Sequence, residues 1–535
     1  MCQNSYNNVI NYPFIDYIIK SYVPEIQKDK SNRKIDMNIF KESMFHQSTK
    51  CNNDDITYER LEYLGDAFFH LAITEYLYIR YDDENEGFLT KLRIRLERGD
   101  SMVELTKILE LDNYVQIYNI SLNDHILEDI FEAFIGAFYL NFNTKYSKTF
   151  VAKLVEKHKN LSEIINHDDN YKDLLLRYFH QMKWGHPIYE YEPTFQDRKK
   201  ISIVKNPFGK VLGKGISNSK KKAEQIASKK ALIALSVIVN GEIDINWSGK
   251  IEKIEKDVKE KEKIDKKSMS VFNTDNKLIK RSNIKKILSI YNIVIPKNIT
   301  INIRLFQEAM THRSYLVRNK LTEKDKIASL SCVKLQKKSN ERLQFLGDAV
   351  IHFVIAEYLY HKYPKADEGF LTRLRCRLEN RESLFYLAKQ TNIGSYVLVS
   401  QNIEVLHGRT NVNIIGGGFE AFVGALYLET GMIITKEFIL AVIRIELDIS
   451  QIAHNETNYK GLILQMYLEN HWGHPDYKIL KEEGPAHCKM FTVGIYLNGK
   501  LIDYGRARSK KKAEQIASKK MYLKFTEQKN SPNLI

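Results

Sequence analysis

Hydrophobic residues recur with the spacing of a helix face in the first third of the chain. Two runs have apolar side chains three and four residues apart, which is the pattern of an amphipathic α-helix that turns one face to a core. The first run comprises Leu61, Leu64, Phe68, Leu71 and Ala72. The second run comprises Leu127, Ile130, Phe131, Phe134, Ile135 and Phe138. The pattern predicts an all-α domain in this part of the chain.

A different pattern follows the helical stretch in each half. A helix is predicted over 170–180, and short strand-like segments come after it. In the second half, Thr492–Leu497 leads into Asn498-Gly499, a dipeptide that favours a tight hairpin turn. A basic, alanine-containing helix then ends the unit, with Ser219 or Ser509 as its N-cap. The expected order is helix, three strands, helix.

The two halves share whole segments of sequence. The shared segments are SKKKAEQIASKK at 219–230 and 509–520, WGHP at 184–187 and 472–475, and EGFLT at 86–90 and 368–372. Because these landmarks keep their order, the chain is a two-domain unit written twice.

The halves are joined by 250–267, where Lys alternates with Glu and Asp. This segment is either a solvated single helix or a flexible linker, and its balanced charge and lack of aromatic residues favour the linker. The predicted organisation is an all-α domain over 8–160, an α-β-β-β-α domain over 168–238, a charged linker over 240–280, a second all-α domain over 281–450 and a second α-β-β-β-α domain over 456–526.

Length and charge indicate how many domains the chain has and what class of partner it binds. A chain of 535 residues exceeds one hydrophobic core, and a formal charge of +15 fits a polyanionic partner such as nucleic acid. An anionic membrane is the other usual partner, but no apolar run approaches the ~20 residues of a membrane span. The five cysteines form no Cys-x-x-Cys pair, which favours a reducing compartment, cytoplasmic or nuclear. Abundant Asn, Ile, Lys and Tyr suggest an AT-rich genome, and giant viruses are one candidate source.

Two pairs of acids have the spacing of metal ligands. Glu62 and Asp66 are four residues apart, and Asp129 and Glu132 are three apart, so each pair lies on one face of a helix. Two such pairs brought together would raise one another's pKa unless a cation lay between them. Hard oxygen ligands of this kind suit Mg²⁺ or Mn²⁺.

Two glycines predict that these pairs converge. Gly65 lies beside the first pair and Gly136 lies one turn beyond Glu132. A glycine inside a helix costs about 1 kcal/mol relative to Ala, so it calls for a packing reason such as a close helix crossing. The alternative is that these acids only form the wet face of a helix. Two acidic pairs, two glycines and a second copy of the motifs that has lost one acid from each pair favour a metal site.

These residues resemble a known family. Glu59–Asp66 and Asp129–Gly136 are similar to the two signature motifs of the ribonuclease III family, which cuts double-stranded RNA. The resemblance extends to Glu86–Arg95 and to a His-x-Ser motif at His46 and His312. It implies that Glu62, Asp66, Asp129 and Glu132 are catalytic metal ligands, and that Glu59 and Glu86 order the site or the subunit contact. It also implies hydrolysis by metal-activated water, leaving a 5′-phosphate and a 3′-hydroxyl.

The second copy departs from this pattern. Gln344 stands where the first ligand would be and Gly417 where the third would be, while Asp348 and Glu420 remain. An amide supplies no charge and a glycine supplies no ligand, so a catalytic metal should bind poorly there. Compensation by a nearby acid such as Glu404 is the alternative.

The basic helices resemble the closing helix of the double-stranded RNA-binding domain. The expected phosphate contacts are Lys220, Lys221, Lys222, Lys510, Lys511 and Lys512, each at a helix N-terminus. Such domains read the shape of A-form RNA over ~16 base pairs and little sequence. The second copy has Gly484–His487 where the family has a minor-groove loop, whereas the first has Phe195–Lys199. We therefore expect the second module, with His487, to bind RNA better.

Two all-α ribonuclease III domains alternating with two α-β-β-β-α RNA-binding domains imply a double-strand-specific endoribonuclease. The first nuclease domain would be catalytic, and the second would be its partner in an internal pseudo-dimer. The alternatives are a homodimer formed through the first copy, and a non-catalytic protein that sequesters double-stranded RNA.

Overall fold

The computed structural model describes most of the chain. The described residues are 8–28, 35–50, 57–161, 171–182, 184–192, 200–235, 237–239, 242–243, 271–318, 321–454, 459–470, 472–483, 489–497, 499–507 and 509–530. They divide into a unit that ends at Glu446 and a second unit that begins at Leu447, and we describe each by itself. The linker segment 250–267 lies outside the described residues.

The first half begins with a helical domain. Its α-helices are α1 (Tyr12–Tyr22), α2 (Glu25–Lys28), α3 (Met37–Glu42), α4 (Glu59–Arg80), α5 (Glu86–Leu96), α6 (Gly99–Ile108), α7 (Asp124–Asn141) and α8 (Thr144–His158). Short 3₁₀ turns lie at Gln47–Thr49, between α3 and α4, and at Leu111–Tyr114, between α6 and α7. Helices α4 and α7 cross at the centre, and the apolar stripes predicted from the sequence form the core there, with Phe68, Phe131 and Phe134 fully buried.

The second half repeats this domain. Its α-helices are α13 (Arg281–Ile290), α14 (Ile303–Ala309), α15 (Glu323–Ala328), α16 (Glu341–Lys362), α17 (Glu368–Leu378), α18 (Arg381–Gln390), α19 (Gln401–Val405) and α20 (Val412–Glu446), with 3₁₀ turns at Arg313–Tyr315, Ile393–Tyr396 and Gly408–Thr410. Helix α20 is broken at Gly431, whose φ is +79°. The stretch just before α13, which the sequence placed in the linker, packs on this domain: Val271 and Ile279 are buried, and Asn273 donates to the carbonyl of Val399.

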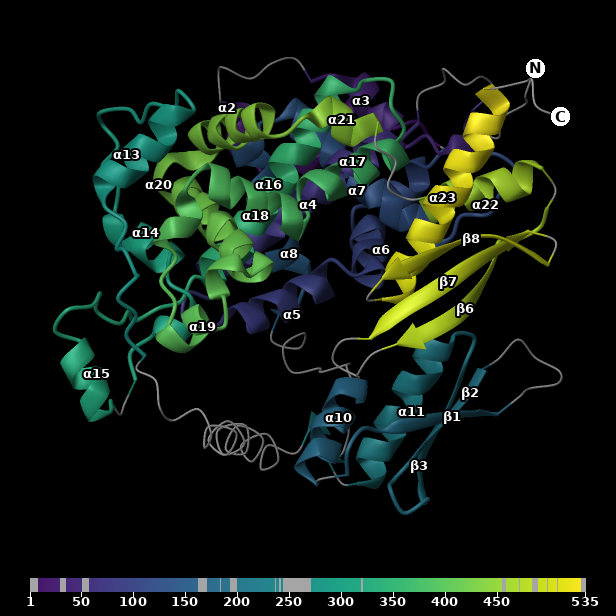
Figure 1. The fold of residues 1–535 in the computed structure, drawn as a ribbon. Helices are drawn as coiled ribbons and strands as arrows, with labels where there is room; N and C mark the ends of the chain where they lie inside the picture. The colour runs from purple at the N-terminus through teal and green to yellow at the C-terminus, as the bar shows by residue number, and fades with distance from the viewer. Residues whose placement is uncertain are drawn as a thin grey trace. The chain divides into compact units, whose positions relative to one another are not determined.

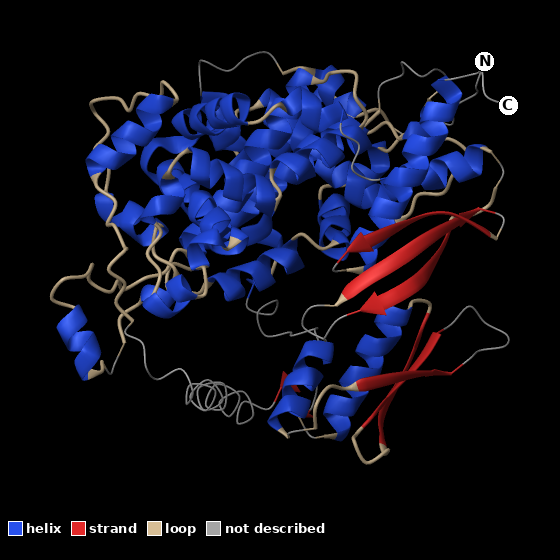
Figure 2. Cartoon of the chain, viewed as in Figure 1, coloured by secondary structure: helices blue, strands red, loops and turns tan. Residues whose placement is uncertain are grey.

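The two RNA-binding modules each have the expected order. The first comprises α10 (Tyr171–Gln181), β1 (Ile188–Glu192), β2 (Lys200–Lys205), β3 (Val211–Ser217) and α11 (Lys220–Ala234), followed by a small hairpin of β4 (Ile238–Val239) and β5 (Glu242–Ile243). In the second unit, α21 (Ile449–His454) precedes α22 (Tyr459–Glu469), β6 (Asp476–Glu483), β7 (Met490–Leu497), β8 (Lys500–Ala507) and α23 (Lys510–Asn530). Figure 2 shows the two three-stranded sheets, which are antiparallel in the orders β1-β2-β3 and β6-β7-β8.

A hairpin turn and two N-cap serines explain where β7 ends and where α11 and α23 begin. Leu497 pairs with Lys500 and Gly499 has a φ of +78°, which confirms the predicted tight turn between β7 and β8. The hydroxyls of Ser219 and Ser509 accept hydrogen bonds from the third backbone amide of α11 and α23, so both serines are N-caps as predicted.

The two helical domains contact each other through α4 and α16 (Figure 1). Arg60 on α4 donates to the carbonyls of Tyr360 (2.8 Å) and Tyr363 (3.0 Å) at the end of α16. Arg342 on α16 makes the matching contacts: it donates to the carbonyls of Tyr78 (2.9 Å) and Tyr81 (2.7 Å) at the end of α4. Each arginine therefore caps carbonyls that a helix C-terminus leaves without intrahelical partners. The interface is reciprocal, as in a two-fold dimer.

The crossing of α4 and α7 tolerates no side chain at its centre. A Cβ on Gly65 would overlap the backbone of Glu132, and a Cβ on Gly136 would overlap the carbonyl of Leu61. Since backbone atoms cannot move aside as a flexible side chain can, the two glycines set the distance between these helices.

We expect Gly65→Ala to lower the free energy of unfolding by about 1–3 kcal/mol or more, because the added methyl group must separate two packed backbones. Gly416→Ala is the matched control, since it is also inside a helix but its Cβ would have no neighbour closer than 3.5 Å. Urea unfolding of both variants measures the difference. An equal response of the two would contradict the packing role of Gly65.

Candidate active site

The helix crossing brings the two acidic pairs together. Glu62 lies on α4 and Asp129 on α7, and both line a pocket of about 630 Å³. Asp66 and Glu132 follow on the same helices but are not among the residues that line it. Glu59 lies at the start of α4 and lines the same pocket. The acids thus converge, and two of the four face the open space.

The electrostatics show how close these carboxyl groups are. Burial, with the charges of Asp129 and Glu368 next in importance, raises the pKa of Glu62 from 4.5 to about 9. Burial together with the charges of Asp66 and Glu62 raises the pKa of Glu132 well above its ordinary value. Burial also raises the pKa of Asp129. At each of these three groups, burial outweighs the neighbouring positive charges and favours the neutral acid.

This donor set fits a hard divalent cation. Carboxylate oxygens are the ligands that Mg²⁺ and Mn²⁺ prefer, and mutual repulsion among buried carboxylates is relieved by a cation. Within the described ranges, no three His, Cys, Asp or Glu side chains already stand in a metal-holding arrangement. The side chains of Glu62, Asp66, Asp129 and Glu132 would therefore have to turn towards the ion.

Asp129 is contacted by two side chains that the sequence did not indicate, the phenol of Tyr58 and the imidazole of His125. The Tyr58 hydroxyl donates to Oδ2 of Asp129 at 3.0 Å, and Nδ1 of His125 lies 3.3 Å from Oδ1. The ring of His46 packs against Tyr58 with ring centroids 5.6 Å apart, and Nδ1 of His46 accepts from the amide of Ser48. His46, Tyr58 and His125 all line the pocket.

A signal for these residues was present in the repeat. The second copy has Asn340 in the position of Tyr58 and Asn413 in the position of His125. Both changes accompany the replacement of the third acid by Gly417. Side chains that change together with a ligand are candidates for contact with it.

The acid from the EGFLT segment lies in the other half's pocket. The sequence analysis assigned Glu86 either to the site or to the subunit contact. Glu86 does not line the first pocket; it lines the second, where its carboxylate accepts from the Thr90 hydroxyl at 2.7 Å. Glu368 takes the corresponding place in the first pocket and has the matching 2.7 Å bond from Thr372. Each pocket is therefore built from both helical domains, and Glu86 acts across the domain contact rather than within its own half.

A second cross-domain contact reaches Asp66. Nη1 of Arg375, on α17, lies 3.7 Å from Oδ2 of Asp66, and its guanidinium stacks over the ring of Tyr63 at 4.9 Å. Arg375 is buried, whereas the side chain of Asp66 is 46% exposed, so solvent reaches the contact from the Asp66 side.

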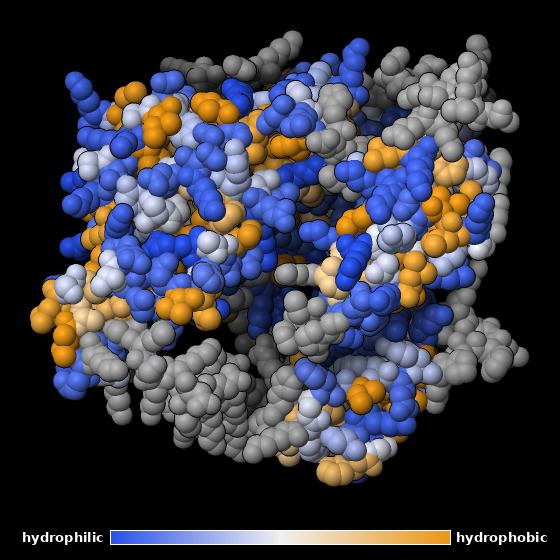
Figure 3. Space-filling view, in the orientation of Figure 1, coloured by the Kyte–Doolittle hydropathy of each residue, from blue (hydrophilic) through white to orange (hydrophobic). Residues whose placement is uncertain are grey.

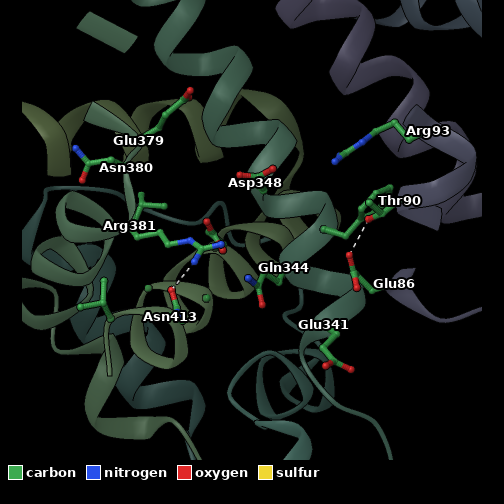
Figure 4. Close-up of a pocket in the computed structure, with 16 residues that line it drawn as sticks. Glu86, Thr90, Arg93, Glu341, Gln344, Asp348, Glu379, Asn380, Arg381 and Asn413 are labelled. Atoms are coloured by element: carbon green, nitrogen blue, oxygen red, sulfur yellow. Dashed lines mark hydrogen bonds between the residues drawn. The ribbon is translucent and has the colours of Figure 1, made fainter. Parts of the chain in front are cut away.

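The second pocket has a volume of about 640 Å³ and lacks the first pocket's acid set (Figure 4). Gln344, Asp348, Gly417 and Glu420 all line it, which places the four matching positions together. Burial and the charge of Asp348 raise the pKa of Glu420 to about 8, while Gln344 and Arg381 oppose this rise.

The compensating acid that we considered does not reach this pocket. Glu404 is not among its lining residues. Its carboxylate is held by Nε of Arg409 at 2.8 Å and by Nδ2 of Asn273 at 2.7 Å.

The basic helices present their lysines to solvent. The exposed residues are Lys220, Lys221, Lys222, Lys510, Lys511 and Lys512. Lys220 lies 4.0 Å from the centre of the Tyr191 ring, and Lys510 lies 3.3 Å from Glu482. His487 and the two loops whose difference led us to rank the modules lie outside the described residues.

None of the described helices combines the length and the apolar character needed to cross a membrane. On the face drawn in Figure 3, hydrophilic residues predominate and hydrophobic ones are scattered among them.

Comparison with known proteins places the chain in a family. A ribonuclease III domain model matches residues 59–143, a ribonuclease-III-like model matches 302–446, and a double-stranded RNA binding motif matches 171–235 and 459–524. The chain is 66% identical over 532 residues to a probable ribonuclease 3 of Acanthamoeba polyphaga mimivirus, covering 98% of this chain and 99% of that one. It is 35% identical over 219 residues to ribonuclease 3 of Enterococcus faecalis, covering 41% of this chain and 89% of that one.

Solved structures were also found. The nuclease domain of ribonuclease III from Campylobacter jejuni matches 30% of this chain and 97% of its own length, with 30% identity and a TM-score of 0.24. Dicer from Giardia intestinalis matches 73% of this chain and 55% of its own length, with 16% identity and a TM-score of 0.38.

The chain belongs to the ribonuclease III family. It is a ribonuclease III-type endoribonuclease, and its two RNA-binding motifs make double-stranded RNA its partner. Enzymes of this family generally depend on a divalent metal ion. The mimivirus relative supports the viral origin that the composition suggested.

The raised pKa of Glu62 predicts a pH-dependent response to metal. When a chelator removes metal ions, the contribution of Glu62 to the free energy of unfolding is fully present below pH 4.5, its ordinary pKa. This contribution is lost as the pH rises through about 9, because the folded state holds a proton that the unfolded state releases. A divalent cation should therefore raise the unfolding temperature more at pH 8.5 than at pH 5.5. Thermal unfolding with and without Mn²⁺ measures this. Glu62→Gln should reduce the difference, and an unchanged response in that variant would place the cation elsewhere.

Proposed function

We propose that the first helical domain hydrolyses double-stranded RNA with water activated by a divalent metal, leaving 5′-phosphate and 3′-hydroxyl ends. The observation that supports this most is the convergence of Glu62, Asp66, Asp129 and Glu132 at a crossing held close by two glycines. Burial raises the pKa of three of these groups, Glu62, Asp129 and Glu132. A cation relieves the repulsion between carboxylates that are buried close together, so this arrangement favours metal binding.

The four acids would hold Mg²⁺ or Mn²⁺. The bound ion would lower the pKa of its water and offset the charge that develops on the phosphate. Tyr58 orients Asp129 by donating a 3.0 Å hydrogen bond to its Oδ2. Glu59 and Glu368 add negative charge at the pocket edge, which strengthens attraction for a cation.

The second helical domain serves as the structural partner of the first. It supplies Glu368 to the first pocket and Arg375 to Asp66, and it caps α4 through Arg342. Because these contacts arise within one chain, an internal pseudo-dimer forms the site without a second copy. With Gln344 and Gly417 in place of two acids, the second pocket would not cut RNA.

The RNA-binding modules would hold the duplex through phosphates. Lys220–Lys222 and Lys510–Lys512 are exposed at the N-termini of helices, where backbone amides add to their positive charge. Contacts of this kind are independent of sequence, so the substrate would be recognised as an A-form duplex.

Glu132→Gln should lower the cleavage rate by several orders of magnitude while leaving duplex binding near the wild-type level, because the lost charge acts chiefly in the transition state. Glu156→Gln is a matched control, since Glu156 is exposed on α8 and pairs with Arg80. Single-turnover cleavage and a binding titration separate the two effects. Retained cleavage in Glu132→Gln would exclude this site, and a wild-type protein that binds but never cuts would favour sequestration.

A single competent site predicts cleavage of one strand per bound duplex. The product should be a nicked duplex, or a hairpin with one arm cut, rather than paired cuts with a short 3′ overhang. The measurement is a gel with each strand labelled in turn, on protein whose oligomeric state is known. Paired cuts by a monomer would contradict an inactive second pocket, and paired cuts by a dimer would indicate that first domains associate between chains.

A further inference from the structure

The three-stranded sheet of the first RNA-binding module has two unlike faces. Helices α10 and α11 cover one of them (Figure 1), and Val204 is fully buried against these helices. On the same face, a Cβ on Gly213 or Gly215 would overlap backbone carbonyls of α11. Because successive side chains of a strand point to opposite sides, the residues next to these positions lie on the other face.

This other face, which we call the outer face, is rich in isoleucine. It comprises Ile188 and Glu190 of β1, Ile201, Ile203 and Lys205 of β2, and Lys214 and Ile216 of β3. Ile188 is 70% exposed and Ile216 is 50% exposed. A single exposed isoleucine is ordinary on a protein surface, but neighbouring ones on one sheet form a patch of the kind that marks an interaction site.

The second module does not repeat this patch. Asp476, Thr492, Gly494 and Arg506 stand where the first module has Ile188, Ile201, Ile203 and Ile216. Both modules nevertheless form the same three-stranded antiparallel sheet. The fold of the module therefore does not require isoleucine at these positions, and the patch calls for a different explanation.

Two opposite charges flank the centre of the outer face. Glu190, Ile203 and Lys214 form one cross-strand row, with Ile203 in the middle. The side chain of Glu190 is 52% exposed and pairs with Lys205 at 2.6 Å, and Lys214 is exposed. One edge of the row is thus acidic and the other is basic.

This distribution of charge is self-complementary. A two-fold axis that lies in an interface and runs along β2 exchanges β1 of one copy with β3 of the other. Glu190 of each copy would then face Lys214 of the other copy, and the row would be matched twice. Ile201 and Ile203, on the central strand, would each face their own counterparts.

We propose that the outer face of the first module is a docking surface for the same face of a second copy of this chain. The isoleucines would be removed from water, and the two Glu190–Lys214 pairs would fix the register of the two sheets. Lys205 would approach its own counterpart, and its ion pair with Glu190 offsets that repulsion. Face-to-face packing of sheets with aligned strands is a common arrangement. The proposal does not depend on the activity of either nuclease pocket.

The size of the outer face indicates a weak dimer. Strands β1, β2 and β3 have 5, 6 and 7 residues. At about 4.8 Å between strands and ~3.3 Å per residue, such a sheet covers roughly 300 Å², well below the ~800 Å² per partner of a standard interface. Association also costs translational and rotational freedom. We therefore expect a dimer that forms at micromolar concentrations and dissociates on dilution.

Sedimentation velocity of the full-length protein without RNA, from nanomolar to high micromolar concentration, tests the proposal. The wild type should change from monomer to dimer as its concentration rises. Ile201→Thr combined with Ile216→Arg, which introduces the second module's own residues, should abolish the dimer, because an unpaired charge would be buried in the interface. Thermal unfolding checks that this variant is folded. A wild type that stays monomeric would leave the face to a different protein and overturn the proposal.

A charge exchange tests the two-fold arrangement itself. Glu190→Lys places like charges opposite each other, and so does Lys214→Glu, so each variant alone should raise the Kd of the dimer about tenfold or more. An equimolar mixture of the two variants should recover the dimer, because opposite charges then face each other in both pairs. This readout does not depend on the isoleucine variant being folded.

Lys478→Glu is the matched control, since Lys478 takes the place of Glu190 in the second module, and this variant should dimerise as the wild type does. Three outcomes would overturn the proposal: a dimer that survives either single charge change, a mixture that fails to recover it, or an equal loss in the control. A dimer that survives would show that the copies associate through another surface, such as the helical domains.

Discussion

The close approach of two helix backbones at paired glycines is the constraint on which the rest of this protein depends. Gly65 and Gly136 bring α4 against α7, and Gly347 and Gly424 repeat the same overlap in the second half. Because Glu62 lies three residues before Gly65 and Glu132 lies four residues before Gly136, the crossing fixes where their side chains meet. Any larger residue would separate the helices and with them the carboxylates that make a cation site.

Each helical domain contributes a residue to the other domain's pocket. A glutamate from the opposite domain lines each pocket, Glu368 in the first and Glu86 in the second. The reciprocal caps by Arg60 and Arg342 hold the domains in the register that makes this exchange work. The second half therefore contributes Glu368 to the first pocket even though its own acid set is incomplete.

The second pocket is better described as rebuilt than as decayed. Its helix crossing is intact, since the overlaps at Gly347 and Gly424 match those at Gly65 and Gly136. What changed is its acid set: Gln344 and Gly417 stand where the first copy has Glu62 and Asp129, and Arg381 has entered, although Asp348 and Glu420 remain.

The sequence by itself determined the two kinds of domain, the helix and strand order, the N-caps at Ser219 and Ser509 and the pairing of acids, because these follow from periodicity and spacing along one segment. Tertiary structure alone decided that Glu86 serves the opposite half's pocket, that Tyr58 and His125 hold Asp129, and that residues 271–280 belong to a packed domain. Local spacing shows which face of a helix a side chain occupies. It does not show which distant segment that face will meet, because that depends on packing between elements hundreds of residues apart.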